Sequence, residues 1–183
     1  MLKVEDCFIP DLKIIKLAKY GDDRGFFIER FKLADFKKHH LPTNFVQDNH
    51  SRSEKNVVRG LHYQFAPAQG KLVGCTKGEV FDVAVDLRVN SKTFGKWFGL
   101  NLDQQTLLWI PAGFAHGFCA ISDEPADLYY KITGGEYNPE GEGGIMWNDP
   151  EININWPVAD AQISKRDKKQ QTLQEYIKNP VFF

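Results

Sequence analysis

Short apolar segments, separated at regular intervals by turn-forming residues, constrain this sequence more than any other feature. Segments of strand length lie at residues 13–17, 26–31, 72–75, 80–87, 96–102, 107–110, 118–121, 128–132 and 152–156. Gly78, Gly95 and Pro111 are among the residues that separate them. Such spacing is typical of an all-β sandwich or barrel. Only residues 33–40 and 168–178 have the pattern of helices, so we expect short peripheral helices.

The size of the chain suits a single domain. Its 183 residues are 42% hydrophobic and 13% aromatic, which is enough to bury one sizeable core. We find no internal repeat, no low-complexity run and no linker rich in proline, glycine or serine. We therefore expect one domain over residues 1–183.

The charge and the apolar runs argue against two classes of protein. The net charge is −1, so no basic field marks the chain as a nucleic-acid binder. The longest apolar runs fall far below the ~18 residues that span a membrane. The first residues carry acids where a signal peptide has a basic region, and three scattered cysteines suit reduced thiols. We expect a cytoplasmic protein that contacts neither nucleic acid nor membrane.

Residues 79–87 show the clearest alternation of apolar and polar side chains. Four large apolar side chains share one face of the expected strand: Phe81, Val83, Val85 and Leu87. Asp82 and Asp86 fall on the other face. That acidic face either meets solvent or lines a polar barrel interior, and alternation alone does not decide between the two.

His62 is a candidate proton acceptor, because imidazole titrates near neutral pH. It lies in an expected strand over residues 57–64. Strict alternation would place Arg59, Leu61 and Tyr63 on one face and His62 on the other. The alternative is a hydrogen-bonded structural histidine.

Scattered polar side chains suggest an acidic, hydrogen-bonding ligand. Arg24, Arg59 and Lys71 lie beside expected strands, where guanidinium and ammonium groups could bind a diphosphate. Gln47 and Asn49 occur at alternate positions, so an extended segment would present both to one side. Ordinary surface charges and a solvated sheet edge are the competing interpretations.

His116 and a tyrosine pair are further candidates. His116 lies between a glycine and aromatic residues, where it suits a substrate contact or core packing better than a metal site. Zinc and iron sites usually need a cluster of three or more ligands. The sequence has no His-x-His motif that could supply two of them. Tyr129 and Tyr130 would point to opposite faces of a strand, one of them inward. A buried phenol often only satisfies a hydrogen bond.

Taken together, these segments resemble the dTDP-4-dehydrorhamnose 3,5-epimerase family over nearly the whole chain. The matching blocks are residues 23–27, 45–51, 58–64, 69–73, 78–86, 93–95, 108–111, 113–118, 130–131 and 147–150. The resemblance implies a cupin-type jelly roll, or double-stranded β-helix, and a homodimer that exchanges N-terminal strands. It implies a nucleotide-sugar substrate and no metal or other cofactor. It also implies that Asp82 and His62 face a barrel interior.

The resemblance assigns roles to individual residues. His62 corresponds to the general base, and Asp167 to the carboxylate that orients it. Lys71 corresponds to the lysine that supports negative charge on the C4 oxygen of the sugar, and Tyr130 to the general acid on the opposite face. Positions that bind substrate in the family correspond to Arg24, Glu29, Gln47, Asn49, Arg59, His116 and Glu142.

One loop departs from the family pattern. The family usually has about eight residues from the catalytic tyrosine to the next proline, whereas Tyr130 to Pro139 spans nine. The aromatic residue that packs on the nucleotide base in the family is therefore either Tyr137 or missing, and we choose Tyr137. The longer loop leaves open a different nucleotide or sugar preference.

The expected reaction converts dTDP-4-keto-6-deoxy-D-glucose to dTDP-4-keto-L-rhamnose by inverting C3 and C5. Two alternatives stay open. A related enzyme could invert only one of these carbons, or move the keto group as an isomerase does. A non-catalytic sugar-binding jelly roll is the more distant alternative, and it would have no need for His62, Lys71, Tyr130 and Asp167 together.

Overall fold

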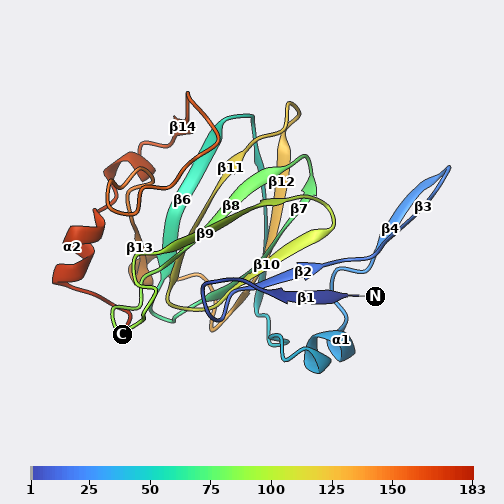
Figure 1. The fold of residues 1–183 in the computed structure, drawn as a ribbon, viewed down its shortest axis with the longest axis horizontal. Coiled ribbons are helices and arrows are strands. Elements are labelled where there is room, and N and C mark those ends of the chain that lie inside the picture. Colours follow the sequence, from blue (N-terminus) through green and yellow to red (C-terminus); the bar gives the residue numbers. More distant parts are fainter. Residues whose placement is uncertain (1) are drawn as a thin grey trace.

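The computed structural model describes residues 2–183 and consists mainly of two β-sheets that face each other (Figure 1). The first sheet has the strand order β1 (Lys3–Asp6), β2 (Lys13–Lys16), β10 (Thr106–Ile110), β7 (Gly70–Lys77), β12 (Ala126–Thr133), β5 (Gln47–Ser53). The second has the order β13 (Glu142–Gly144), β6 (Val57–Gln64), β11 (Phe114–Ala120), β8 (Val80–Asp86), β9 (Trp97–Leu102). Neighbouring strands along both orders are antiparallel. The expected all-β jelly roll is confirmed.

The remaining elements lie around this pair of sheets. They are the hairpin strands β3 (Lys19–Asp22) and β4 (Gly25–Ile28), helix α1 (Leu33–Lys38), two 3-10 turns (Pro139–Gly141 and Asp167–Lys169), β14 (Gln162–Ile163) and helix α2 (Leu173–Lys178). The β3–β4 hairpin projects away from the sheets on the side opposite α2 (Figure 1). Within residues 2–183, no helix is long and apolar enough to cross a lipid bilayer.

Three clusters of buried apolar side chains hold the sheets together. One fills the space between the sheets and includes Val73 of β7 and Ala84 of β8. A second lies on the outer face of the second sheet, where Val83 packs with Tyr176 of α2. The third lies on the outer face of the first sheet, under Phe36 of α1. Each sheet therefore buries apolar side chains on both of its faces.

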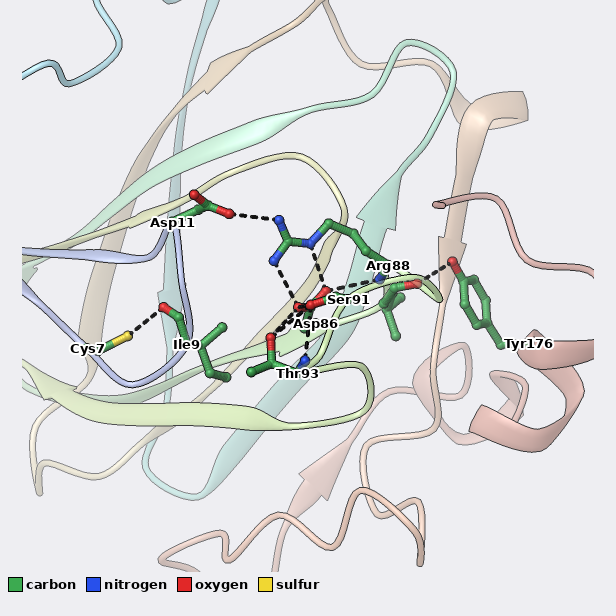
Figure 2. Close-up of polar contacts among 9 residues, drawn as sticks. Cys7, Ile9, Asp11, Asp86, Arg88, Ser91, Thr93 and Tyr176 are labelled. Carbon is green, nitrogen blue, oxygen red and sulfur yellow. Dashed lines mark hydrogen bonds and ion pairs between the residues drawn. The ribbon is translucent and has the colours of Figure 1, made fainter.

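Strand β8 confirms the predicted alternation and decides the question that it left open. Val83, Val85 and Leu87 pack in the outer cluster. Asp82 and Asp86 are fully buried on the other face, between the sheets. Asp86 accepts hydrogen bonds there from nearby side chains (Figure 2). The acidic face thus lines the interior of the barrel.

The predicted strand over residues 152–156 is wrong, because the segment forms turns and irregular structure. The carboxylate of Asp149 accepts hydrogen bonds from the backbone N–H groups of Glu151, Ile152 and Leu173. These bonds close a turn and tie it to the start of α2. The apolar side chains of the segment still pack in the outer cluster, so their pattern reflects burial and not a strand.

Three other predicted elements begin or end at different residues in the structure. The predicted strand at 26–31 ends at Ile28 and pairs only with β3. The predicted strand at 118–121 begins earlier, at Phe114, and so includes His116. The predicted helix at 168–178 is two pieces. The second piece begins after Thr172, whose side chain and that of Glu175 form a capping box.

Candidate active site

A cavity of about 280 Å³ opens between the two sheets near β5, β6, β7 and β12. Seven of the predicted site residues line it: Gln47, Asn49, His62, Lys71, Tyr130, Tyr137 and Glu142. A second hollow, of about 590 Å³, lies beside it and shares His62 as a wall. Arg59 and Asp167 line this second hollow. The fold therefore brings residues that are up to 120 positions apart in the sequence to two adjacent hollows.

His62 forms a histidine–carboxylate pair with Asp167. The ring Nε2 lies 2.7 Å from the Asp167 carboxylate, which the 3-10 turn at Asp167–Lys169 holds in place. Burial opposes ionisation of Asp167, but the contacts with His62, the Gly60 N–H and Ser164 outweigh it and lower the pKa of this carboxyl. An ionised partner at Nε2 leaves Nδ1 to accept a proton from a ligand and stabilises the imidazolium that results.

A β-bulge, with one extra residue in β6, changes which side chains point to the same side of the sheet as His62. His116 pairs with His62 across the sheet, yet Phe118 pairs with Arg59, so one more residue lies on the β6 side. Leu61 packs outward as predicted, but Arg59 turns to the same side as His62. The prediction that Arg59 and His62 face opposite ways is therefore wrong.

Gly60 makes this bulge possible. Its φ of +117° lies in a region that L side chains avoid, and a Cβ would lie 2.6 Å from the Cα of Gly117. Close packing of the two backbones therefore requires glycine here.

Lys71 enters the cavity from β7, on the sheet opposite His62. Its Nζ donates a hydrogen bond to the carbonyl oxygen of His62 at 3.3 Å. Burial lowers the pKa of Lys71 to about 8, although the negative charges of Glu142 and Asp82 act in the opposite direction. Among the described residues, Lys71 is the only lysine that lines this cavity.

The pKa of Lys71 predicts an alkaline limit to catalysis. Because its pKa is lowered to about 8, the ammonium form is present below that pH and is lost above it. If the charged form supports an oxyanion, kcat/KM should fall as the pH rises through about 8. A pH profile of kcat/KM measures this, and a rate that stays constant up to pH 10 would contradict the assignment.

Tyr130 confirms the prediction of two phenols on opposite faces of β12. Its side chain packs against the cluster between the sheets, whereas the Tyr129 hydroxyl donates to Asp48 on the outside at 3.3 Å. Burial raises the pKa of Tyr130, and Glu142 raises it further while Arg59 opposes the shift. The phenol therefore keeps its proton at neutral pH and is available to donate it.

The longer loop after β12 forms part of the cavity wall. The Tyr137 N–H donates to Gln47 Oε1, and the Tyr137 hydroxyl donates to Glu142 Oε2, both at 2.9 Å. Glu142 also forms an ion pair with Arg166, the neighbour of Asp167. Tyr137 is thus tied to the wall of the cavity and remains half-exposed.

Gln64 and Gln69 also line this cavity, and Arg166 lines the second hollow; none of the three was predicted as a site residue. Gln69 Nε2 donates to the Gly135 carbonyl at 2.8 Å, and Gln64 Nε2 donates to the Glu136 carbonyl at 3.1 Å. Arg166 is the third, through its ion pair with Glu142. Gln64 and Gln69 lie inside matching blocks, and Arg166 directly precedes Asp167, which was the only signal in the sequence because their partners are set by the fold.

Comparison with known proteins identifies the family. A family model described as dTDP-4-dehydrorhamnose 3,5-epimerase matches residues 6–175. The chain belongs to this epimerase family. The dTDP-4-dehydrorhamnose 3,5-epimerase of Shigella flexneri is 54% identical over 163 residues, which cover 87% of this chain and 89% of that one. A dTDP-4-dehydrorhamnose 3-epimerase of Streptomyces niveus is 42% identical over 159 residues, covering 85% and 76%.

A solved structure agrees with the epimerase fold. RmlC from Legionella pneumophila Philadelphia 1, in complex with dTDP-4-keto-L-rhamnose, matches with a TM-score of 0.90 and 45% identity, covering 95% of this chain and 94% of that one. The resemblance seen in the sequence is therefore confirmed, together with the cupin-type jelly roll and the isomerase class.

Three predicted epimerase residues line neither hollow. Arg24 is 89% exposed on the β3–β4 hairpin and contacts Asp22. Glu29 follows the hairpin and forms an ion pair with Lys32 at 3.7 Å. A single chain does not bring either of them to His62. His116 is buried beside His62 in the sheet, with its Nε2 2.8 Å from the Asp82 carboxylate.

The structure offers no ready cluster of metal ligands in the region it describes. Among residues 2–183, no three histidine, cysteine, aspartate or glutamate side chains gather where they could hold an ion together. The site residues instead suit proton transfer and charge stabilisation.

Proposed function

We propose that this protein is a dTDP-4-dehydrorhamnose 3,5-epimerase, converting dTDP-4-keto-6-deoxy-D-glucose to dTDP-4-keto-L-rhamnose. One observation carries the proposal: a base, a charge-stabilising ammonium and a protonated phenol converge on one cavity. These are His62 with Asp167, Lys71, and Tyr130. Epimerisation beside a ketone needs these three functions and consumes no redox equivalent.

The proposed reaction proceeds through an enolate. His62 removes the proton from C3 or C5, and the electron pair of that C–H bond forms a double bond to C4. The C4 carbonyl oxygen becomes an oxyanion, which the Lys71 ammonium stabilises in a partly enclosed site. Tyr130 then donates its proton to the same carbon from the opposite face, and the ketone re-forms. Solvent reprotonates Tyr130 and takes the proton from His62, so the protein returns to its starting state.

The direct test is product analysis by proton NMR. The purified protein is incubated with dTDP-4-keto-6-deoxy-D-glucose in D₂O, and the recovered sugar is reduced and assigned. We expect inversion and deuterium at both C3 and C5. Inversion at C3 alone would make the protein a 3-epimerase, like the named relative from Streptomyces niveus. A non-catalytic sugar-binding protein would exchange no hydrogen.

Replacing Lys71 with alanine should lower kcat by roughly 10²–10³, the usual cost of removing one donor that stabilises an oxyanion. Binding of dTDP should fall less, because the ammonium acts at the sugar. Lys71→Arg should also be slow, since a planar guanidinium does not replace a compact ammonium in a tight site. Turnover and dTDP affinity are measured separately. Lys77→Ala, which removes an exposed lysine at the end of the same strand, is the matched control.

We infer that two copies of the chain assemble through the β3–β4 hairpin, which would carry Arg24 and Glu29 to the cavity of the second copy. The hairpin projects from the sheets and exposes Tyr20, Phe26 and Phe27 by 51–63% of their surface (Figure 1). Exposed aromatic side chains of this kind mark protein interfaces. Pairing with a second copy would also account for Arg24, which has no role at the cavity of its own chain.

Light scattering at micromolar concentration should therefore give the mass of a dimer. Phe27→Asp should shift the mass toward that of a monomer, because a charge would be buried in an apolar contact. Phe183→Asp, at an exposed position on the opposite side of the molecule, serves as the control and should leave the mass unchanged. A monomeric mass for the unaltered protein would refute the assembly.

A further inference from the structure

The loop between β12 and β13, which is longer than the family pattern, packs directly on the loop between β6 and β7. Gly134 has a φ of +89°, and a Cβ at this position would lie 2.0 Å from the carbonyl oxygen of Ala68. The side-chain amide of Asn138 donates to the carbonyl oxygen of Ala66 at 2.7 Å. The β12–β13 loop is therefore held against the β6–β7 loop, with Tyr137 between these two points of contact.

Gln64 of β6 binds the backbone on both sides of Tyr137. Its Nε2 donates to the carbonyl oxygen of Glu136 at 3.1 Å, and its Oε1 accepts from the N–H of Asn138 at 2.8 Å. The same Nε2 donates to the carbonyl oxygen of Pro67 in the β6–β7 loop, also at 3.1 Å. The side chain is only 3% exposed, and both of its N–H groups are used in this way. Gln64 thus has no donor left for a ligand, and any effect on binding has to pass through the loop.

The other contacts of Tyr137 are more open to water than those of Gln64. The bonds from Tyr137 to Gln47 and Glu142 lie at the exposed side of the loop, whereas Gln64 is buried in the wall. A hydrogen bond shielded from water is electrostatically stronger than one that water competes for. Gln64 is therefore the main internal support of the segment that carries the Tyr137 ring. A binding group that is already held in its bound conformation loses less entropy when the ligand arrives.

We propose that Gln64 is a positioning residue of the epimerase, which holds the β12–β13 loop so that Tyr137 is in place for the nucleotide before the substrate binds. The inference rests on the proposed function, because the ring meets a nucleotide only if the substrate is a nucleotide sugar. His62 and Gln64 lie two positions apart on β6 and line the same cavity. One strand would then carry both the base for the sugar and the support for the nucleotide contact.

The test replaces Gln64 with leucine, which keeps a side chain of similar size but removes the amide. The Kd of dTDP, measured by calorimetry, and the KM of the nucleotide sugar should each rise by about 10-fold, because the loop is then ordered only on binding. The kcat at saturating substrate should change little, since His62, Lys71 and Tyr130 lie outside the loop. Amide hydrogen exchange at Asn138 should become faster in the ligand-free variant. A folded Gln64→Leu variant with an unchanged Kd for dTDP refutes the proposal.

A double-mutant cycle with Tyr137→Ala distinguishes positioning from a general loss of structure. Tyr137→Ala alone should weaken dTDP binding, because the ring is gone. Adding Gln64→Leu to it should then change the Kd little, since Gln64 has no ring left to position. Additive effects of the two substitutions would overturn the proposal, because Gln64 would then act on the nucleotide by another route.

Gln104→Leu is the matched control, because Gln104 Nε2 also donates to a backbone carbonyl, that of Thr76 at 3.2 Å, but lines neither hollow of the site. It should leave the Kd of dTDP unchanged, and an equal rise in both variants would overturn the proposal.

Should Gln64→Leu not fold, Gln64→Glu enters the same cycle. It keeps the shape and the acceptor for the Asn138 N–H but loses the donors to the Glu136 and Pro67 carbonyls. The dTDP measurements need no turnover, so an unaltered protein that binds dTDP without converting the sugar would refute the proposed function alone. An unaltered protein that does not bind dTDP would overturn both.

Discussion

Replacing His62 with alanine is expected to abolish both epimerisation and uptake of solvent deuterium. The structure places this side chain between Asp167 and the cavity that holds Lys71 and Tyr130. Without the imidazole no group in that position takes the C–H proton, so no enolate forms and neither carbon exchanges. A positioned general base contributes about 10²–10⁴ in rate, and here both steps of the reaction depend on the same base.

The measurement is NMR or mass spectrometry of the sugar recovered from D₂O, after reduction of the ketone. His50→Ala is the control, because His50 lies on the exposed side of β5 and should leave both readouts unchanged. Melting curves establish that each variant is folded. Exchange at the unaltered rate in His62→Ala would refute the central assignment.

Asp167→Asn should lower both epimerisation and deuterium uptake, but less than His62→Ala does. The base remains, but the carboxylate that fixes its orientation and stabilises the imidazolium is gone. Exchange and inversion should fall together, since both follow from formation of the enolate. A loss of inversion alone would place Asp167 in a different step.

Replacing Tyr130 with phenylalanine is expected to separate exchange from inversion. The ring and its packing remain, and His62 and Lys71 are untouched, so the enolate still forms. His62 then returns deuterium to the face from which it removed the proton. The sugar should gain deuterium at C3 or C5 while inversion falls by about 10²–10⁴, the range for loss of a general acid. This separation follows only from a mechanism that uses two faces.

Tyr129→Phe is the matched control for this variant. Tyr129 is the adjacent phenol on the same strand, but it contacts Asp48 on the outer face of the sheet. Its removal should change neither exchange nor inversion. Normal inversion in Tyr130→Phe would show that Tyr130 is not the acid. Loss of both exchange and inversion would show that the phenol is needed before the enolate forms.

Local patterns in the sequence determined the class of fold and several side-chain directions. Period-two alternation correctly placed Val83 and Asp82 on opposite faces of β8, and Tyr129 and Tyr130 on opposite faces of β12. It succeeded because successive side chains of a regular strand must point to opposite faces. The family resemblance selected seven residues that do line one cavity, although only the fold brings them together.

Alternation failed where the backbone is irregular. The extra residue at Gly60 in β6 turned Arg59 to the side of His62, and the buried Asp149 made a turn of a segment with the apolar content of a strand. The bulge depends on a partner distant in sequence, Gly117, and the burial of the turn depends on its bond to Leu173, although the turn itself is closed by the nearby Glu151 and Ile152. A local pattern carries no information about such partners.

What the sequence by itself determined was therefore the type of structure and the chemical inventory: an all-β barrel, a histidine, a lysine, a tyrosine and an aspartate suited to proton transfer. Only the tertiary structure decided how their charges interact. Burial lowers the pKa of Lys71 to about 8, and the pairing of His62 with Asp167 lowers the pKa of that carboxyl. These properties arise from the low polarity of the space between two packed sheets, which exists only once strands far apart in the chain have paired.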